Sequence, residues 1–185
     1  KTWRDVTPPF GPECAAIDPA ASRTLVAAGY EGAFARSTDG GISWKTGSIG
    51  DAAASTMMKG VLKNVRALAF SGKRLLAAGG QGDGFAAASD DDGATWTALD
   101  WSEGWGYNWA LAVAKNALLV GGDNGLAAST DGGKTFARVP GVKPCLGVGG
   151  RFAVSPDGLR VVYSFRGQVV ASADGGKTFA PLAGP

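Results

Sequence analysis

The chain has 185 residues, of which 45% are hydrophobic, 18% are charged and 30 are glycine, a composition typical of an all-β domain with many tight turns. Its 18 basic and 16 acidic side chains are scattered and nearly balanced, so no nucleic-acid partner is expected, and no apolar run approaches the roughly 20 residues of a membrane span. Histidine is absent, which excludes Ser-His-Asp and Cys-His catalysis and removes the commonest neutral metal ligand, so we expect neither a metal nor a cofactor.

The elements expected along the chain begin with one short strand at residues 1–7. Four longer units follow, each with short apolar stretches separated by turns that contain glycine; they span residues 14–47, 65–100, 109–140 and 151–183. In the second unit the expected strands are residues 66–70, 74–78, 85–89 and 95–99. Four antiparallel strands in about 40 residues is the period of a propeller blade. The sequence therefore predicts one all-β domain, a β-propeller with four blades of four strands and one extra outer strand.

Each unit carries the same motif between its third and fourth expected strands. The motif reads Ser-x-Asp-x-Gly-x-Thr/Ser-aromatic. Four copies in the same register are not explained by chance. Its defining positions are Ser37, Asp39, Gly41 and Trp44, then Ser89, Asp91, Gly93 and Trp96, then Ser129, Asp131, Gly133 and Phe136, and finally Ser172, Asp174, Gly176 and Phe179.

The residue types of the motif predict a hairpin that satisfies its own polar groups. A short Asp side chain accepts hydrogen bonds from backbone N–H groups of its turn, and the Ser or Thr hydroxyl closes the turn from the other side. The glycine adopts positive φ without a steric penalty, and the aromatic ring is buried between sheets. The motif is therefore predicted to be structural. A calcium site is the alternative, and the acidic run Asp90-Asp91-Asp92 is where it would lie.

The N-terminal residues 1–6, Lys-Thr-Trp-Arg-Asp-Val, match residues 134–139, Lys-Thr-Phe-Ala-Arg-Val, which end the third unit. The chain is therefore expected to open with the outer strand of a blade whose other strands are not present. This match favours a piece of a larger propeller, or a ring completed by several chains. A four-bladed ring with a loose N-terminal strand is the alternative.

The two cysteines, Cys14 and Cys145, leave two interpretations open. They form one disulfide, or they are two free buried thiols. Two cysteines without histidine do not provide the four ligands of a usual zinc site.

The motif at residues 129–136, Ser-Thr-Asp-Gly-Gly-Lys-Thr-Phe, and the turn at residues 122–125 resemble those of Asp-box propellers, also called bacterial neuraminidase repeats. The chain is similar in particular to the bacterial photosystem II assembly-factor-like propellers of the sialidase superfamily. The resemblance implies a β-propeller over nearly the whole chain and an extracellular or periplasmic protein, although no signal peptide is visible. It implies no single function, because the box occurs in sialidases, other glycosidases, sorting receptors and scaffolds.

The loops at the end of the blades opposite the boxes are the expected binding face. They hold most of the length variation, and loops on a rigid scaffold usually carry binding. The expected contact residues are Trp101, Glu103, Trp105, Tyr107 and Trp109, joined by Tyr30, Asp83, Asp123 and Arg166 from shorter turns. The alternative is that the tryptophans fold back as a hydrophobic plug.

The function predicted from these features is that of a non-catalytic binding or assembly scaffold for a protein partner. No cluster of three arginines is evident, and no catalytic residue is assigned. The alternative is a carbohydrate-active module, either a sialidase-like glycoside hydrolase fragment or a lectin-like glycan binder. It stays open because Glu31, Asp83, Glu103 and Asp123 lie on the expected face, and glycosidases use two carboxylates about 5 to 10 Å apart.

Overall fold

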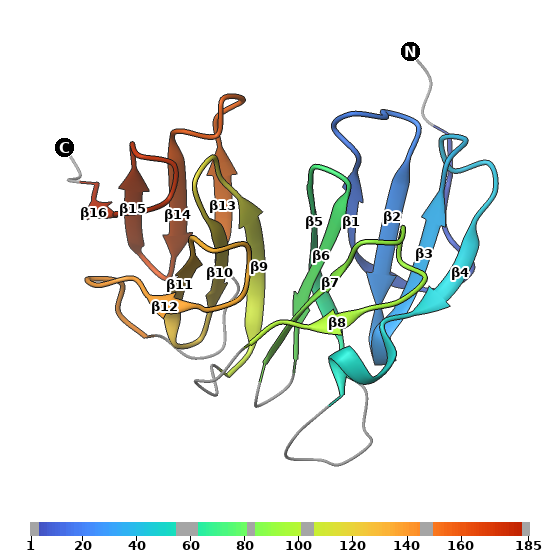
Figure 1. The fold of residues 1–185 in the computed structure, drawn as a ribbon, viewed down its shortest axis with the longest axis horizontal. Helices are drawn as coiled ribbons and strands as arrows, with labels where there is room; N and C mark the ends of the chain where they lie inside the picture. The colour runs from blue at the N-terminus through green and yellow to red at the C-terminus, as the bar shows by residue number, and fades with distance from the viewer. Residues whose placement is uncertain (1–3, 55–62, 81–83, 101–105, 145–149, 183–185) are drawn as a thin grey trace.

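The computed structural model describes residues 4–54, 63–80, 84–100, 106–144 and 150–182. In these residues the chain forms four antiparallel sheets of four strands, each sheet following the order of its strands in the sequence (Figure 1). The predicted all-β class and the four-stranded units are confirmed. The described residues outside the strands include two short 3-10 turns, η1 at Tyr30–Gly32 and η2 at Gly50–Ala53.

The four sheets are named blades 1 to 4 in chain order. Blade 1 contains β1 Pro12–Ile17, β2 Leu25–Gly29, β3 Ala33–Ser37 and β4 Lys45–Ser48; blade 2 contains β5 Val65–Ser71, β6 Arg74–Gly79, β7 Phe85–Ser89 and β8 Thr97–Ala98. Blade 3 contains β9 Asn108–Val113, β10 Leu118–Gly122, β11 Gly125–Ser129 and β12 Ala137–Arg138; blade 4 contains β13 Arg151–Val154, β14 Val161–Phe165, β15 Gln168–Ser172 and β16 Ala180–Pro181.

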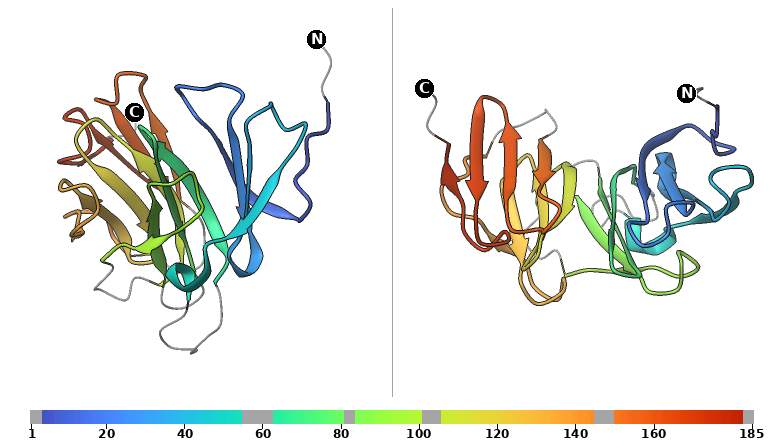
Figure 2. Two further views of the ribbon diagram at one scale, coloured as in Figure 1. Left: turned by 45° about the vertical axis from the view of Figure 1, so that its right-hand side comes forward. Right: turned by 90° about the horizontal axis from the view of Figure 1, so that it is seen from above.

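The blades follow one another in an arc, with the N- and C-terminal ends on opposite sides of the molecule (Figures 1 and 2). Their first strands lie next to each other along the arc, since β1 contacts β5, β5 contacts β9 and β9 contacts β13. The outer strands β4, β8, β12 and β16 lie at the edge of each sheet opposite its first strand. This is the radial arrangement of propeller blades, seen as an open part of a ring.

Apolar side chains fill the spaces between neighbouring blades. Val26 of blade 1 packs in one cluster with Leu75 of blade 2, and Leu119 of blade 3 packs in another with Tyr163 of blade 4. All four side chains are at most 1% exposed. Burial at roughly 25 cal/mol per Å² of apolar surface makes these interblade layers the main stabilising contribution.

The outer strands of blades 2 to 4 are shorter than predicted. The sequence suggests residues 95–99 as a strand in blade 2, but β8 covers Thr97–Ala98. The N–H of Thr95 is donated to the Asp91 carboxylate at 2.8 Å and is therefore not free for the sheet. The first residues expected in the outer strand therefore belong to the box turn, because the box aspartate accepts an N–H group that the strand would otherwise use.

The boxes satisfy their own polar groups by hydrogen bonds within the turn, as their residue types predict. In blade 1 the Asp39 carboxylate accepts the N–H groups of Ile42 and Ser43 at 2.9 and 3.0 Å and the Ser43 hydroxyl at 2.6 Å. The Ser37 hydroxyl donates to Asp39 at 2.8 Å and accepts the Gly41 N–H at 2.8 Å. The serine and threonine contacts recur in the other boxes.

The glycine two residues after each box aspartate packs closely on a neighbouring segment, which in blades 2 to 4 is the preceding blade. These glycines have φ between 82° and 91°. A Cβ on Gly93 would lie 2.2 Å from the Phe34 ring of blade 1, and one on Gly176 would lie 3.2 Å from Ala117 of blade 3. The glycine is thus required both by the backbone conformation and by the close approach of the neighbouring sheet.

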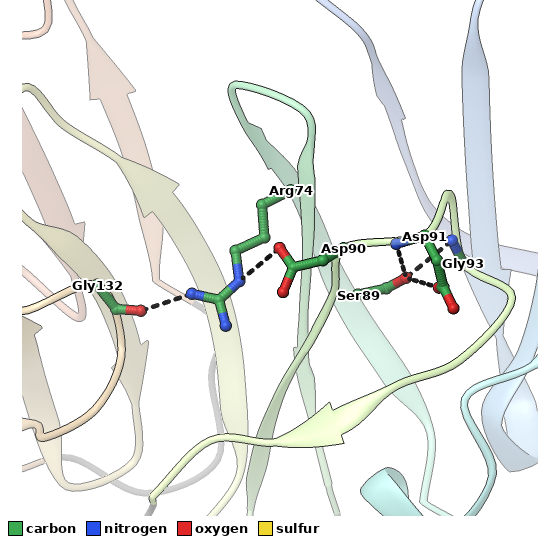
Figure 3. A network of polar contacts seen from close by, with 6 residues as sticks. All are labelled: Arg74, Ser89, Asp90, Asp91, Gly93 and Gly132. Atoms are coloured by element: carbon green, nitrogen blue, oxygen red, sulfur yellow. Dashed lines mark hydrogen bonds and ion pairs between the residues drawn. The ribbon is translucent and has the colours of Figure 1, made fainter.

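Polar contacts tie the same turns to the preceding blade. Arg36 of blade 1 forms an ion pair with Asp92 at 3.0 Å, and Arg74 of blade 2 donates to the Gly132 carbonyl at 2.8 Å (Figure 3). The backbone N–H of Asn116 in blade 3 donates to the Gly175 carbonyl at 3.1 Å. Each contact reaches the residue after the box aspartate, so one position anchors three successive interfaces.

The N-terminal segment contacts the first box of blade 1. A Cβ on Gly41 would lie 2.5 Å from Val6 Cβ, and Arg4 donates to the Gly40 carbonyl at 3.2 Å. The Trp44 indole N–H also donates to the Val6 carbonyl at 3.0 Å. Val6 therefore contacts Gly41 as Leu99, the residue after outer strand β8, contacts Gly133 of blade 3, in agreement with the sequence match. In this structure the segment is held against blade 1.

Substituting Gly93 with Ala should destabilise the protein more than substituting Gly132 with Ala. Both positions have positive φ, but a Cβ on Gly132 meets nothing within 4 Å. The difference is expected to be about 1–3 kcal/mol, the cost of forcing a methyl group into a packed core. Urea unfolding of the two variants measures it, and equal destabilisation would show that the contact with Phe34 is unimportant.

Stability should fall in acid as the box aspartates are protonated. The hydroxyl and N–H of Thr95 lower the pKa of Asp91 to about 2, and similar hydrogen bonds lower the pKa values of Asp39, Asp131 and Asp174. The folded pKa lies below the unfolded value near 3.9, so the contribution is complete above about pH 4 and is lost as pH falls toward 2.

Thermal midpoints measured from pH 6 to pH 2 test this linkage. Asp91→Asn should flatten the acid limb of the curve, because the variant lacks the titrating group. Asp100→Asn removes one carboxylate outside the boxes and controls for the loss of charge. An identical acid limb in Asp91→Asn and in the unsubstituted protein would contradict the assignment.

Candidate functional site

A β-bulge recurs at the start of the first strand in blades 1 to 3. The register shifts between Pro12 and Cys14, between Val65 and Ala67, and opposite Gly121 and Gly122. The extra residues are Glu13, Arg66 and Trp109, which occupy equivalent positions. Bulges of this kind re-aim side chains and are frequent beside functional sites.

The bulged strands and β13 line an axial groove of about 590 Å³ that all four blades share. Its walls come from residues 13–15 of β1, 66–68 of β5, 110–111 of β9 and 151–152 of β13. The charged residues lie at the beginning of these strands, at the end of the blades opposite the boxes. This position follows from the antiparallel order, because the boxes join the third and fourth strands of each blade.

The groove combines two guanidinium groups with one carboxylate among the described residues. Arg66 pairs with Glu13 at 3.3 Å, and the two side chains are 22% and 17% exposed. Arg151 is exposed and donates to the carbonyl of Gly150 at 3.0 Å. The described lining therefore carries an excess of positive charge, arranged around an apolar floor that includes Leu68 and Leu111.

Tyr30 extends the polar cluster from the turn after β2. Its hydroxyl hydrogen-bonds to Glu13, and this bond, followed by the negative charge of Glu13, raises the pKa of Tyr30. The Tyr30 side chain is nevertheless 60% exposed. Tyr30 thus connects the predicted loop face to the groove.

Cys14 lines the groove as a half-buried thiol. Its thiol is free and lies 3.6 Å from the carbonyl of Ala28 and 3.7 Å from that of Val65. Burial raises the pKa of the Cys14 thiol to about 12, so it stays protonated near neutral pH. Cys145 lies outside the described residues.

Two turns on the predicted binding face hold non-glycine residues in a left-handed conformation. Glu31 has φ 54° between β2 and β3, and Arg166 has φ 40° at the equivalent turn between β14 and β15. Both are exposed. Such strain costs of order 1–3 kcal/mol per residue and is commonest at functional sites.

The remaining predicted contact residues are either buried to different degrees or lie outside the described residues. Asp123 is 3% exposed, so its side chain is not part of the surface, and its N–H donates to the Tyr107 carbonyl at 3.0 Å. Tyr107 is partly buried. Trp109 lies in β9, but its side chain is outside the description. The positions Asp83, Trp101, Glu103 and Trp105 also lie outside the described residues.

The sequence prediction missed the groove itself. It named neither Arg66 nor Arg151 as a contact residue and assigned no role to Glu13. Aligning the repeats shows a signal that could have found two of them, because Glu13 and Arg66 hold charges at the same inner-strand position.

Each aspartate of the acidic run in the second box contacts a donor of the protein, although Asp90 and Asp92 are 75% and 66% exposed. Asp90 pairs with Arg74 at 3.3 Å, whereas Asp91 accepts the box hydrogen bonds (Figure 3). Asp92 points instead to Arg36. In the part of the chain that the structure describes, no three His, Cys, Asp or Glu side chains lie close enough to hold a metal ion.

Comparison with known proteins agrees with this geometry. The BNR/Asp-box repeat model matches residues 35–46, which is the first box and its flanks. A search of curated proteins gives no match. The described residues contain no helix long and apolar enough to cross a membrane. The chain is therefore built from Asp-box repeats folded as blades of a β-propeller, as the sequence predicts.

Similar solved structures come from two kinds of propeller. "YCF48 bound to D1 peptide" is 17% identical with TM-score 0.55, over 86% of this chain and 49% of that one. YCF48 from Cyanidioschyzon merolae is 15% identical with TM-score 0.64, over 94% and 57%. The GH74 xyloglucanase from Xanthomonas campestris is 18% identical with TM-score 0.63, over 91% and 29%. At these identities the likeness shows the fold, and the chain spans between about a quarter and just over half of those proteins.

The Tyr30–Glu13 contact predicts a measurable change in tyrosine ionisation. Glu13→Gln removes both the carboxylate acceptor and its charge, so the pKa of Tyr30 should fall toward its ordinary value. Absorbance titration near 295 nm follows the ionisation, and Tyr30→Phe identifies the step that belongs to this residue. An unchanged Tyr30 titration in Glu13→Gln would place the two side chains apart in solution.

Proposed function

We propose that these blades form a non-catalytic scaffold that binds an extended segment of a partner protein at the loop-side end of the axial groove. The observation that carries the proposal is the pair of guanidinium groups, Arg66 and Arg151, at the rim of a groove with an apolar floor. The similarity to YCF48 bound to D1 peptide supports a peptide as the ligand class.

The groove offers the donors and acceptors that an extended peptide needs. Guanidinium groups bind carboxylates or backbone carbonyls, and Arg66 and Arg151 provide them from two different blades. Glu13 can accept a peptide N–H. Leu111 and Phe152 line the floor, where an apolar side chain of the partner would be buried.

The loop face extends this site outward under the same proposal. Tyr30 and Arg166 are exposed on the turns of that face. Trp101, Glu103 and Trp105 are proposed to form the rim that contacts the partner beyond the groove. Aromatic and arginine side chains are the usual energetic anchors of such interfaces.

A carbohydrate-active module is the second candidate. It is favoured by the likeness to a GH74 xyloglucanase and by the exposed ring of Tyr30, since aromatic rings stack on sugars. A glycan array and a panel of fluorogenic glycosides test it directly. Specific glycan binding or turnover would favour this candidate over peptide binding.

A peptide array probed with the purified chain tests the leading proposal. Peptides that bind should lose about tenfold or more in affinity in Arg66→Ala and in Arg151→Ala, since hydrogen bonds to charged groups contribute about 1.5–3 kcal/mol. Arg160→Ala removes an exposed arginine near the box end of blade 4 and should leave affinity unchanged.

Isothermal titration gives the affinities, and thermal midpoints confirm that each variant is folded. Equal loss in Arg160→Ala would indicate non-specific attraction between charges. Peptides that bind with the same affinity to all three variants would place the site elsewhere.

A further inference from the structure

Blade 1 and the box turn of blade 2 enclose a cleft of about 560 Å³ at the box end of the molecule. Its lining includes Phe34, Arg36, Lys45 and Gly47 of blade 1 and Asp91 and Asp92 of blade 2. None of its lining residues belongs to the axial groove, whose charged residues lie at the opposite end of the blades. This space is called the box-side cleft.

Three positions of blade 1 in this lining carry residue types that blades 2 to 4 lack at the same places. Blade 1 has Arg36, Lys45 and Gly47. The equivalents in the other blades are alanine at the first position, alanine or threonine at the second, and leucine or valine at the third. In blade 2 they include Ala88 and Leu99, which lie in an apolar cluster. The interface between blades 1 and 2 is therefore polar at places where the interface between blades 2 and 3 is apolar.

Gly47 keeps the cleft open. Its counterpart Leu99 covers Gly133 at the following interface, 3.1 Å from the position of a Cβ there. A Cβ on Gly47 would come no closer than 3.8 Å to the Gly93 carbonyl oxygen and to the Phe34 ring. The surroundings of Gly47 thus have room for a side chain, and the glycine leaves that room to the cleft.

The wall of the cleft that belongs to blade 1 carries two cations side by side. Arg36 and Lys45 are directly opposite each other in the register of β3 and β4, and like charges in such a pair are unfavourable. Asp92 pairs with Arg36 at 3.0 Å and relieves one of the two charges. The exposed Lys45 ammonium makes no ion pair or hydrogen bond with the described residues. It is a donor without an acceptor at the mouth of the cleft.

The wall that belongs to blade 2 carries acceptors. In the other three boxes, the N–H of the residue after the glycine that packs on its neighbour donates to the box carboxylate. In blade 2 this N–H, that of Ala94, donates instead to the backbone carbonyl of Asp91 at 3.2 Å. The Asp91 carboxylate therefore keeps one acceptor position that its counterparts have filled, and both Asp91 and Ala94 line the cleft.

Asp92 adds a second carboxylate to this wall at a conformational cost. The other boxes have glycine at its position, whereas Asp92 has φ 62°. Strained positions of this kind are commonest at functional sites. The side chain is 66% exposed, so one of its oxygens remains accessible beside the contact with Arg36.

The two walls together specify the charges of a ligand. Lysine and arginine side chains only donate hydrogen bonds, whereas ionised carboxylates only accept them. The two cations and two carboxylates of the cleft sum to no net charge, so a complementary ligand is neutral overall, with an anionic group at one end and a donating cation at the other. Charge-assisted hydrogen bonds at both ends are stronger than those between neutral groups.

We propose that the box-side cleft binds a small zwitterion of the amino-acid type, with its carboxylate on Lys45 and its ammonium group on Asp91 and Asp92. This site is independent of the proposed peptide-binding function, because it uses neither Arg66 nor Arg151 and lies at the other end of the blades. A volume of 560 Å³ is within the range of small-molecule sites.

Isothermal titration of the full chain with each of the free proteinogenic amino acids, at constant ionic strength, tests the proposal. At least one amino acid should bind and should raise the thermal midpoint, since only the folded chain has the cleft. The matching amine, which lacks the carboxylate, should bind about tenfold or more weakly, because it loses a set of hydrogen bonds to charged groups. The matching carboxylic acid, which lacks the ammonium group, should lose as much.

Variants that introduce residues of blade 2 locate the site. Lys45→Thr reproduces Thr97 and should lower the affinity about fivefold, because a charge pair at an exposed place contributes modestly. Lys134→Ala removes an exposed lysine from the box of blade 3 and should leave the affinity unchanged. Gly47→Leu reproduces Leu99 and should abolish binding by filling the cleft, while the room around Gly47 keeps the thermal midpoint near that of the unsubstituted protein.

Three results would overturn the proposal. The first is that no amino acid binds at millimolar concentrations. The second is that the amine, the carboxylic acid or a neutral sugar binds as tightly as the amino acid, which would show that the cleft does not recognise both charges. The third is that binding persists in Lys45→Thr and in Gly47→Leu. If Gly47→Leu does not fold, the comparison of Lys45→Thr with Lys134→Ala decides the location.

Discussion

The hydrogen bonds that one carboxylate makes within each box are the interaction on which the blades depend. A turn that reverses the chain in four to five residues leaves several N–H groups without sheet partners, and such groups are costly to leave unsatisfied. Asp39 and its three counterparts accept these groups together with a hydroxyl from either side. The turn is then compact enough for its glycine to touch the neighbouring sheet.

The contact made by that glycine links local structure to blade order. Gly93 reaches Phe34, whereas the neighbouring Asp92 reaches Arg36, so one turn makes both an apolar and a charged contact with the blade before it. Asp92 holds φ 62° where the other boxes have glycine, and aspartate tolerates this conformation better than most residues. The charged pair offsets part of that strain.

Local rules in the sequence were sufficient to predict the fold, whereas the groove needed longer-range information. The positive φ of the box glycines and the four-stranded units follow from residue type and spacing, both of which are visible in the sequence. A bulge is different, because it depends on how β1 aligns with β2, and it turned Glu13 toward Arg66. Asp123 was expected at the surface because it follows a strand, but the Tyr107 segment covers it, and Gly106 lies beside its Cβ.

The head-to-tail contacts also bear on how stability is distributed along the chain. Each blade packs on its predecessor through an apolar layer, one box glycine and one polar contact, so stability depends mainly on contacts between neighbouring blades, as in other repeat proteins. Blades 2 and 3 have a partner on both sides, whereas blade 4 has one on a single side. Loosening of the structure on warming therefore starts at the margins of the array and moves inward.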